Sequence, residues 1–238
     1  MYHDRDSASR VVESPGSASN GLAAATATEN LPRVLRGFFS QFGHPTGWVG
    51  GVAGMLMART ANDDRWVVDL SDVDPSDRVL DVGCGPGVTL RLLDERAHEG
   101  FVAGVDPSEL MLRQASRRNR AAIRAGRMEL RLATADTLPY ADGTFTRACA
   151  VHSIYFWPSL AHGLRELHRV VSPGGRLVLA ARMHRSHAHR LDPSRYGLRD
   201  GDHDVITNAL GCLGFRDASV TRAEGLDRQT MAAVIATR

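Results

Sequence analysis

The chain has 238 residues, of which 43% are hydrophobic and 24% are charged, and its formal net charge is +2. These figures describe an ordinary globular protein, and a charge so near neutral disfavours a nucleic-acid or membrane partner. All 29 basic residues are arginine, which excludes a Schiff-base lysine, a pyridoxal-phosphate anchor and a phosphate-binding loop that ends in Gly-Lys.

The cysteine usage and the hydropathy pattern narrow the class further. The three cysteines form no Cys-x-x-Cys pair, so we expect neither a disulfide framework nor a metal site built on thiolates. No apolar run approaches the roughly 18 residues of a membrane span, and the N-terminus lacks the apolar core of a signal peptide. A cytoplasmic enzyme or binding protein is therefore expected.

The N-terminal part divides into two segments. Residues 1–30 are rich in Ser, Ala, Gly, Asn and Thr without a sustained period, which predicts a disordered tail. Residues 31–70 carry apolar side chains at helical spacing, interrupted by a Gly/Pro break at 42–47. We expect a helical segment over 31–75 and a separate domain over 76–238.

From residue 76 onward, apolar strands alternate with helical segments. The expected strands are 78–82, 101–105, 129–133, 146–151 and 176–181. The expected helices are 88–95, a helix from 108 into the 120s, and 161–171, followed by a turn at 172–175. Strands separated by helices predict an α/β fold with a parallel, doubly wound sheet.

A glycine-rich turn follows the first expected strand, where Asp81 precedes Gly83, Gly85 and Gly87. Such a turn between a strand and a helix lets the backbone approach a ligand closely and aims helix N-terminal amides at it. A dinucleotide-binding fold requires Gly-x-Gly-x-x-Gly, but the position of its third glycine is occupied by Val88. The spacing therefore disfavours a nicotinamide or flavin dinucleotide.

Two more acids stand at the ends of the following strands. Asp106 ends the second strand, about 20 residues past the turn, where a carboxylate can accept from both hydroxyls of a ribose. Asp136 follows the third strand. Either acid alone could cap the next helix, but in series with Asp81 and the glycines they form an ordered constellation.

These motifs, spread over residues 76–182, resemble the class I S-adenosylmethionine-dependent methyltransferases of the small-molecule type. The resemblance implies a Rossmann-like, mostly parallel seven-stranded sheet with an antiparallel edge, whose last strands lie near 218–222 and 231–237. It also implies an N-terminal helical lid. Asp106 would bind the ribose hydroxyls and Asp136 the adenine amino group. The residues expected to contact the donor are Asp81, Gly83, Cys84, Gly85, Gly87, Asp106, Pro107, Met111, Ala135, Asp136, Thr137 and His152.

The acceptor is expected at the end of the fourth strand. No Asn-Pro-Pro-Tyr or Asp-Pro-Pro-Tyr element occurs there, which disfavours methylation of nucleic-acid amines. His152 is the main candidate for a general base, with the alternative that it orients the donor or packs in a polar pocket, and Tyr155 is a second catalytic candidate. Tyr155 and Trp157 either stack on the acceptor or pack in the core. His44 and Trp48 are expected to line the acceptor site from the lid.

Two further patterns have competing interpretations. A metal site or a solvated polar loop would explain the histidines at 184, 187 and 189. A phosphate-binding stripe or a solvated helix face would explain the arginines at 113, 117, 118, 120, 124, 127 and 131.

The sequence thus predicts methyl transfer from S-adenosylmethionine to a small molecule, with release of S-adenosylhomocysteine. The alternatives are a cofactor-binding scaffold or cyclisation catalyst that transfers no methyl group, and an RNA methyltransferase. Neither the acceptor nor the oligomeric state follows from the sequence.

Overall fold

The computed structural model describes residues 61–183, 197–199, 201–224 and 230–238. The helices are α3 (Ala61–Ser71), α4 (Val88–Arg96), α5 (Glu109–Arg118), α6 (Arg120–Arg124), the 3₁₀ helix η1 (Ile154–Phe156), α7 (Leu160–Val170) and α8 (Asp202–Leu213). The strands are β1 (Arg78–Val82), β2 (Phe101–Asp106), β3 (Met128–Leu132), β4 (Phe145–Val151), β5 (Val171–Arg182), β6 (Arg216–Glu224) and β7 (Thr230–Thr237). Among the described residues no helix is long and apolar enough to cross a membrane.

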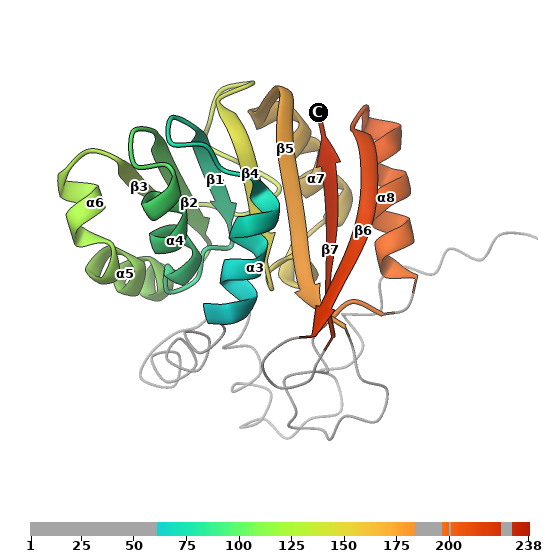
Figure 1. Cartoon of the computed structure of the whole chain (residues 1–238), viewed down its shortest axis with the longest axis horizontal. Coiled ribbons are helices and arrows are strands. Elements are labelled where there is room, and N and C mark those ends of the chain that lie inside the picture. Colours follow the sequence, from blue (N-terminus) through green and yellow to red (C-terminus); the bar gives the residue numbers. More distant parts are fainter. Residues whose placement is uncertain (1–60, 184–196, 200, 225–229) are drawn as a thin grey trace, which may run out of the picture.

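One seven-stranded sheet organises these elements, in the order β3-β2-β1-β4-β5-β7-β6 (Figure 1). The first five strands are parallel, and β7 lies antiparallel between β5 and β6. From β1 the chain moves outward to β2 and β3, then returns to the other side of β1 as β4. This reversal creates a switch point at the carboxyl ends of β1 and β4, which is where open α/β sheets bind ligands. The predicted sheet class is therefore confirmed.

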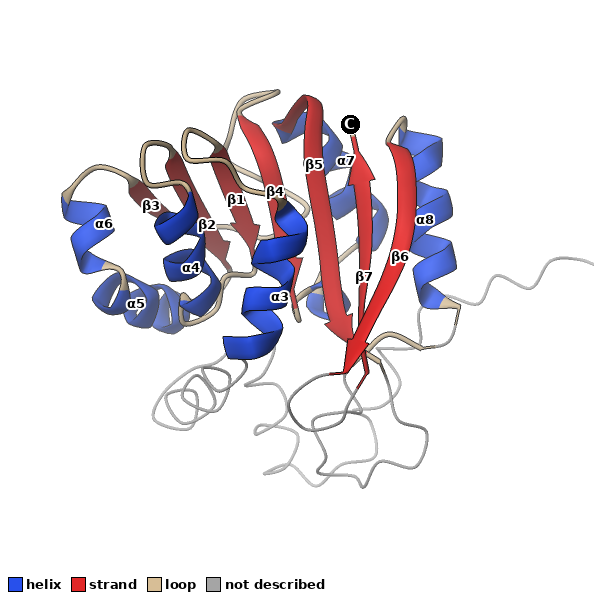
Figure 2. Cartoon of the chain, viewed as in Figure 1, coloured by secondary structure: helices blue, strands red, loops and turns tan. Residues whose placement is uncertain are grey.

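Helices cover both faces of the sheet (Figure 2). On one face α3, α4, α5 and α6 pack over a core that includes Val67, Leu93 and Ala115. On the other face α7 and α8 pack over a core that includes Leu167 and Leu210. The buried strands are apolar on both sides, as expected for a parallel sheet between two helical layers.

The described part of the predicted lid does not stand apart from the domain. Helix α3 is the only element of the 31–75 range that the structure describes, and its side chains Val67 and Val68 are fully or almost fully buried against the sheet. The expected lid residues His44 and Trp48 lie outside the described residues, as do the tail at 1–30 and the histidines at 184, 187 and 189.

The turn expected at 172–175 is wrong, because these residues belong to β5. Phe145 pairs with Val171, and the register then shifts before Arg147 pairs with Arg176. Within this irregular stretch the Gly174 N–H donates to the Arg238 carbonyl over 2.7 Å. Strand pairing on both sides therefore carries the chain through the Gly-Gly sequence as a bulge.

The single helix expected from Ser108 into the 120s is also wrong, because α5 ends at Arg118 and a short α6 follows. Asn119 separates them. Its side-chain amide donates to the carbonyls of Gly87 and Ala115, each over 3.0 Å, and the residue is only 4% exposed. The break therefore attaches the helical layer to the glycine turn.

Replacing this amide tests that attachment. Asn119→Ala should lower the free energy of unfolding by about 1–3 kcal/mol, because two backbone carbonyls lose a buried donor. Urea denaturation would measure the loss. The adjacent Arg120→Ala is the control, since Arg120 is exposed and should change stability by less than about 0.5 kcal/mol. Equal losses in the two variants would contradict the assigned role.

Candidate active site

The glycine turn after β1 presents bare backbone at the carboxyl edge of the sheet. Gly83, Gly85 and Gly87 have φ values of 77°, 50° and 78°, in the left-handed region that favours glycine. A Cβ on Gly83 would lie 2.4 Å from the Cβ of Ser153, whereas a Cβ on Gly85 would meet nothing within 4 Å. The turn is thus held tightly at one end and faces open space at its middle glycine.

Asp106 holds this turn against the end of β2. Its Oδ2 accepts from the Gly85 N–H over 2.9 Å, and its Oδ1 accepts from the Ser108 N–H over 2.8 Å. Ser108 in turn caps α5, because its hydroxyl accepts from the Met111 N–H. The carboxylate predicted only to bind a ribose therefore also fixes the turn and the start of the next helix.

Asp81 is buried beneath the turn with one oxygen lacking a partner. It is 1% exposed, its Oδ1 lies 3.8 Å from the Cys149 thiol, and its Oδ2 has no hydrogen bond within the described residues. Burial, with added repulsion from Asp64 and Asp106, raises the pKa of Asp81 to about 8. Three carboxyl groups thus lie near the turn, and a cationic group bound there would favour their ionised forms.

The loop between β3 and β4 is fixed by Arg169 of α7. Its guanidinium donates to the carbonyls of Leu138 and Tyr140 and pairs with Glu166, whose carboxylate accepts from the Leu138 N–H over 2.8 Å. The same loop carries Asp136, whose Oδ1 is buried and has no hydrogen bond among the described residues. The loop, fixed by Arg169, therefore carries a carboxylate oxygen that can accept a hydrogen bond from a ligand.

His152 occupies a strained position directly after β4. Its φ is +54°, which is unusual for a residue with a side chain, and its N–H donates to the Ala180 carbonyl over 2.8 Å. The next residue, Ser153, donates its hydroxyl to the Val82 carbonyl over 2.6 Å. The backbone is thus attached to both β5 and β1, and the imidazole is held at the switch point.

Sequence reasoning missed the charged groups beside this imidazole. The Nε2 of His152 lies 3.4 Å from Oδ2 of Asp63, which also accepts from the Nη2 of Arg182 over 2.9 Å. Burial would raise the pKa of Asp63, but His152 and Arg182 together hold it below its ordinary value. The adjacent Asp64 is also buried and accepts from the Thr89 hydroxyl over 2.8 Å.

The signal for these acids was weak. Asp63 and Asp64 stand in the first turn of a helix, where acids ordinarily occur because they complement the helix dipole. Only the packing of α3 against α4, β4 and β5 shows that both side chains point inward.

The two aromatic candidates lie on the core side of this region. Tyr155 and Trp157 are partly buried and pack against the core beneath α7. A Cβ on Gly163 would lie 2.5 Å from the six-membered ring of Trp157, so the indole lies directly on the helix. Burial raises the pKa of the Tyr155 phenol. Packing of both rings in the core accounts for these contacts.

The other expected donor-contact residues follow the three strand ends. Pro107 and the buried Met111 stand beside Asp106, and the buried Ala135 and the exposed Thr137 flank Asp136. Cys84 lies within the turn, where burial raises the pKa of its thiol well above the usual range. The structure therefore brings the expected donor contacts to one edge, with His152 at the neighbouring strand end.

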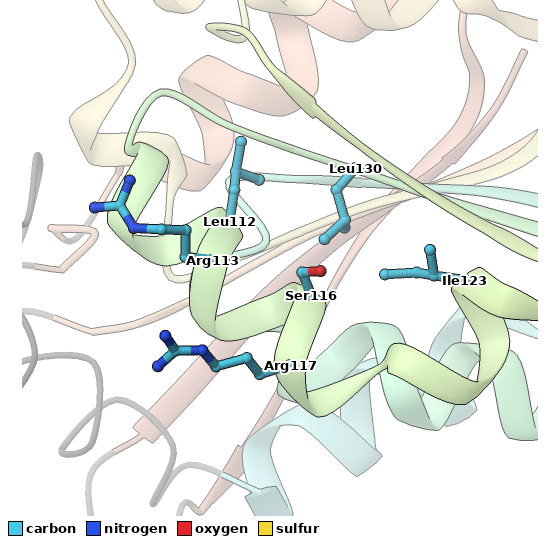
Figure 3. A pocket seen from close by; sticks show the side chains of 6 residues that line it. All are labelled: Leu112, Arg113, Ser116, Arg117, Ile123 and Leu130. Carbon is cyan, nitrogen blue, oxygen red and sulfur yellow. The ribbon is translucent and has the colours of Figure 1, made fainter.

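A pocket of about 510 Å³ lies elsewhere, between α5, α6 and β3 (Figure 3). Its lining consists of Leu112, Arg113, Ser116, Arg117, Ile123 and Leu130. None of the strand-end acids lines it, so we place the candidate active site at the carboxyl edge of the sheet.

Comparison with protein families gives a match over residues 80–179 to the family described as "Methyltransferase domain". A similar curated protein is 27-O-demethylrifamycin SV methyltransferase of Amycolatopsis mediterranei, which is 33% identical over 56% of this chain and 48% of its own length. Matched segments cover 32% to 69% of the curated relatives' lengths, so most of these relatives are considerably longer than the part they share.

Solved structures with the same fold include enzymes of two kinds. An S-adenosylmethionine-dependent methyltransferase from Aquifex aeolicus matches with a TM-score of 0.60 and 20% identity, over 74% of this chain and 89% of its own. The [4+2]-cyclase SpnF matches with a TM-score of 0.61 and 19% identity, over 75% and 81%. At these identities the likeness concerns the fold.

The buried Asp81 carboxyl predicts a pH dependence of stability. Its pKa is about 8 in the folded protein and near 3.8 when unfolded, so between these values the folded state retains a proton that the unfolded state has lost. Stability from this group is therefore present at low pH and is lost as the pH rises toward 8. Asp81→Asn should become more stable relative to the parent, by at least about 1 kcal/mol, between pH 5 and pH 8.

Urea unfolding of ligand-free protein at the two pH values would measure this gain. Glu95→Gln serves as the control, because that carboxylate is exposed on α4 and pairs only with Arg91 across one helical turn. A stability difference between Asp81→Asn and the parent that stays constant with pH would contradict the assignment.

Proposed function

We propose that this chain, whose residues 80–179 match the methyltransferase-domain family, is a class I S-adenosylmethionine-dependent methyltransferase that transfers a methyl group to a small-molecule acceptor. The observation that carries this proposal is the edge of the sheet itself. A bare glycine turn and acids at three successive strand ends meet there beside a histidine.

The residues present fit S-adenosylmethionine. Its sulfonium and ammonium groups are cationic, and the turn is surrounded by Asp64, Asp81 and Asp106. The unpartnered Oδ2 of Asp81 and Oδ1 of Asp136 are buried acceptors that need donors. The open space at Gly85 leaves room for a ligand against the backbone.

Each acid has a different part in holding this donor. Asp106 would accept from the ribose hydroxyls, Asp136 from the adenine amino group, and Asp81 would face the cationic methionine part. When bound, the donor supplies an activated methyl group on a sulfonium, so the chain's own contribution is positioning, exclusion of water and management of protons.

His152 is the residue suited to remove a proton from the acceptor. An imidazole can act as a base near neutral pH, and the ring of His152 is held at the end of β4, next to the turn. Methyl transfer to a hydroxyl or acidic carbon requires loss of that proton. The similar rifamycin enzyme is named for O-methylation of a small molecule, which supports the same class of acceptor here.

The arginine run gives little support to an RNA acceptor. Several of its members are engaged within the protein: Arg113 pairs with Glu109, Arg127 with Asp94, Arg131 with Glu129, and Arg118 donates to the Pro86 carbonyl. Arginines paired in this way fit the solvated-face interpretation.

Calorimetry with S-adenosylmethionine and S-adenosylhomocysteine tests the donor half of the proposal. Incubation with panels of small hydroxyl, thiol and amine compounds, followed by detection of S-adenosylhomocysteine, tests the transfer. Donor binding without turnover on any panel would favour a scaffold or cyclisation catalyst, and no binding of either compound would reject the proposal.

Substitution of Asp106 should weaken donor binding. Asp106→Asn keeps the shape but removes the charge that strengthens hydrogen bonds to the ribose, so the dissociation constant should rise by about 5–150-fold, or 1–3 kcal/mol. The variant is preferable to alanine because the amide oxygen can still accept from one of the two backbone N–H groups that bind the carboxylate. The control is Asp94→Asn, which should leave the donor affinity unchanged. Asp94 lies on α4, and its carboxylate pairs with Arg127. Normal donor affinity in folded Asp106→Asn would show that Asp106 is only structural.

Substitution of His152 separates a base from a donor-orienting residue. If it removes the proton, His152→Ala should slow methyl transfer by about 10²–10⁴-fold while donor affinity stays nearly intact. The parent rate should rise with pH through one ionisation and then level off. His162→Ala is the control because His162 lies exposed on α7. Parallel losses of affinity and rate, with the pH profile retained, would assign His152 to donor orientation instead.

A further inference from the structure

We propose that Asp63 is a positioning residue for His152, holding the imidazole with its proton on Nε2 and leaving Nδ1 to receive the acceptor's proton. This inference rests on the proposed function, because it concerns how the assigned base is prepared. It gives α3, which lies outside the motifs of the first five strands, a specific part in the reaction.

The geometry of the cluster supports this role. The carboxylate of Asp63 is 3% exposed, and its Oδ2 lies 3.4 Å from Nε2 of His152, which is an ion-pair distance. Both ring nitrogens are buried, and neither has a partner in hydrogen-bond geometry within the described residues, so the approach of Nε2 to Asp63 is an ion-pair contact. A carboxylate accepts only from a protonated nitrogen, so the neutral ring placed beside it favours the proton on Nε2.

Arg182 makes the carboxylate necessary for a base at this position. Its Nη2 and Nε donate to the same Oδ2 of Asp63, over 2.9 and 3.2 Å. The charges of Asp63 and Arg182 cancel, so an imidazolium can form beside a neutral pair. Loss of the Asp63 charge would remove this compensation of the guanidinium and would disfavour protonation of His152.

The surroundings of the ring come from three elements. Asp63 faces it from α3 and Arg182 from β5, while the partly buried Tyr155 of η1 is close enough for Arg182 to act on its phenol. Burial raises the pKa of that phenol, so it stays uncharged near neutral pH. Among the residues that the structure describes, Asp63 and Arg182 are thus the charged groups that act on the imidazole.

A neutral His152 ring with its proton on Nε2 can take up the proton that methyl transfer releases from the acceptor. The acceptor's X–H bond breaks, and its electron pair forms the new bond to the methyl carbon. The carbon–sulfur pair remains on sulfur, which becomes the neutral thioether of S-adenosylhomocysteine. The acceptor's proton goes to Nδ1, and the resulting imidazolium is stabilised by Asp63 through Nε2.

NMR titration of the His152 ring tests the proposal without an acceptor. The His152 signal is assigned by its loss in His152→Ala, and its midpoint is then followed in two variants. Asp63→Asn should lower the midpoint by about one pH unit, because the ring loses the negative charge beside it while the positive charge of Arg182 remains. Arg182→Gln should raise the midpoint by about half a pH unit or more, because the charge of Asp63 then acts on His152 without compensation by the Arg182 guanidinium. Shifts of opposite sign cannot arise from a general loosening of the structure.

The nitrogen chemical shifts provide a second readout. In the parent they should report the neutral ring protonated on Nε2, and Asp63→Asn should increase the fraction protonated on Nδ1. The matched control is Asp64→Asn, since Asp64 is the equally buried neighbour that faces Thr89. It should leave both midpoint and tautomer as in the parent.

Several results would overturn the inference. They are an unchanged midpoint in Asp63→Asn, shifts of the same sign in the two variants, or an equal response in Asp64→Asn. If Asp63→Asn does not fold, two other variants still test the inference. Arg182→Gln must raise the midpoint, and Asp63→Glu must preserve the Nε2 tautomer. The titration requires no donor or acceptor, so failure of the proposed methyl transfer would be recognised separately by calorimetry and turnover.

Discussion

The hydrogen bonds from Gly85 and Ser108 to the carboxylate of Asp106 hold the site in one piece. They attach the turn after β1 to the end of β2 and to the start of α5, so three elements share one anchor. The turn then determines where open backbone is presented, and Ser153 limits how close the end of β4 can come. Strand ends that are separated by tens of residues in sequence become parts of one surface because of this anchor.

The same anchoring of the strand ends gathers several acidic side chains at the site. Bringing the ends of β1 and β2 together places Asp81 and Asp106 close to each other, and α3 adds Asp64. Burial, with added repulsion from these like charges, raises the pKa of Asp81, and a cationic ligand would relieve that repulsion. Nearby, Asp63 meets a guanidinium and an imidazole instead. One helix therefore contributes a carboxylate to each half of the site.

The sequence predicted the parts of the fold that depend on local pattern. Apolar strands, the spacing of Gly83, Gly85 and Gly87, and the acids at the strand ends were all readable, because parallel strands place their carboxyl ends at one edge. The inward direction of Asp63 was not readable, because it depends on how α3 packs against the sheet. The helix break at Asn119 and the bulge at Gly174 likewise come from partners distant in sequence, namely Gly87 and Arg238. Because a methyltransferase and a [4+2]-cyclase share this fold, the reaction has to be argued from the side chains around His152.

The position of β7 has a consequence for how the protein is made. This strand is the last of the seven in the chain, yet it lies inside the sheet, with β5 on one side and β6 on the other. While the chain emerges from the ribosome, β6 has no neighbour to pair with until residues 230–237 have been synthesised. The β5 and β6 edges stay unsatisfied during that interval and are open to wrong pairing with other chains. Closure of the sheet therefore waits for the synthesis of β7, and a chain truncated shortly before residue 230 would carry exposed strand edges.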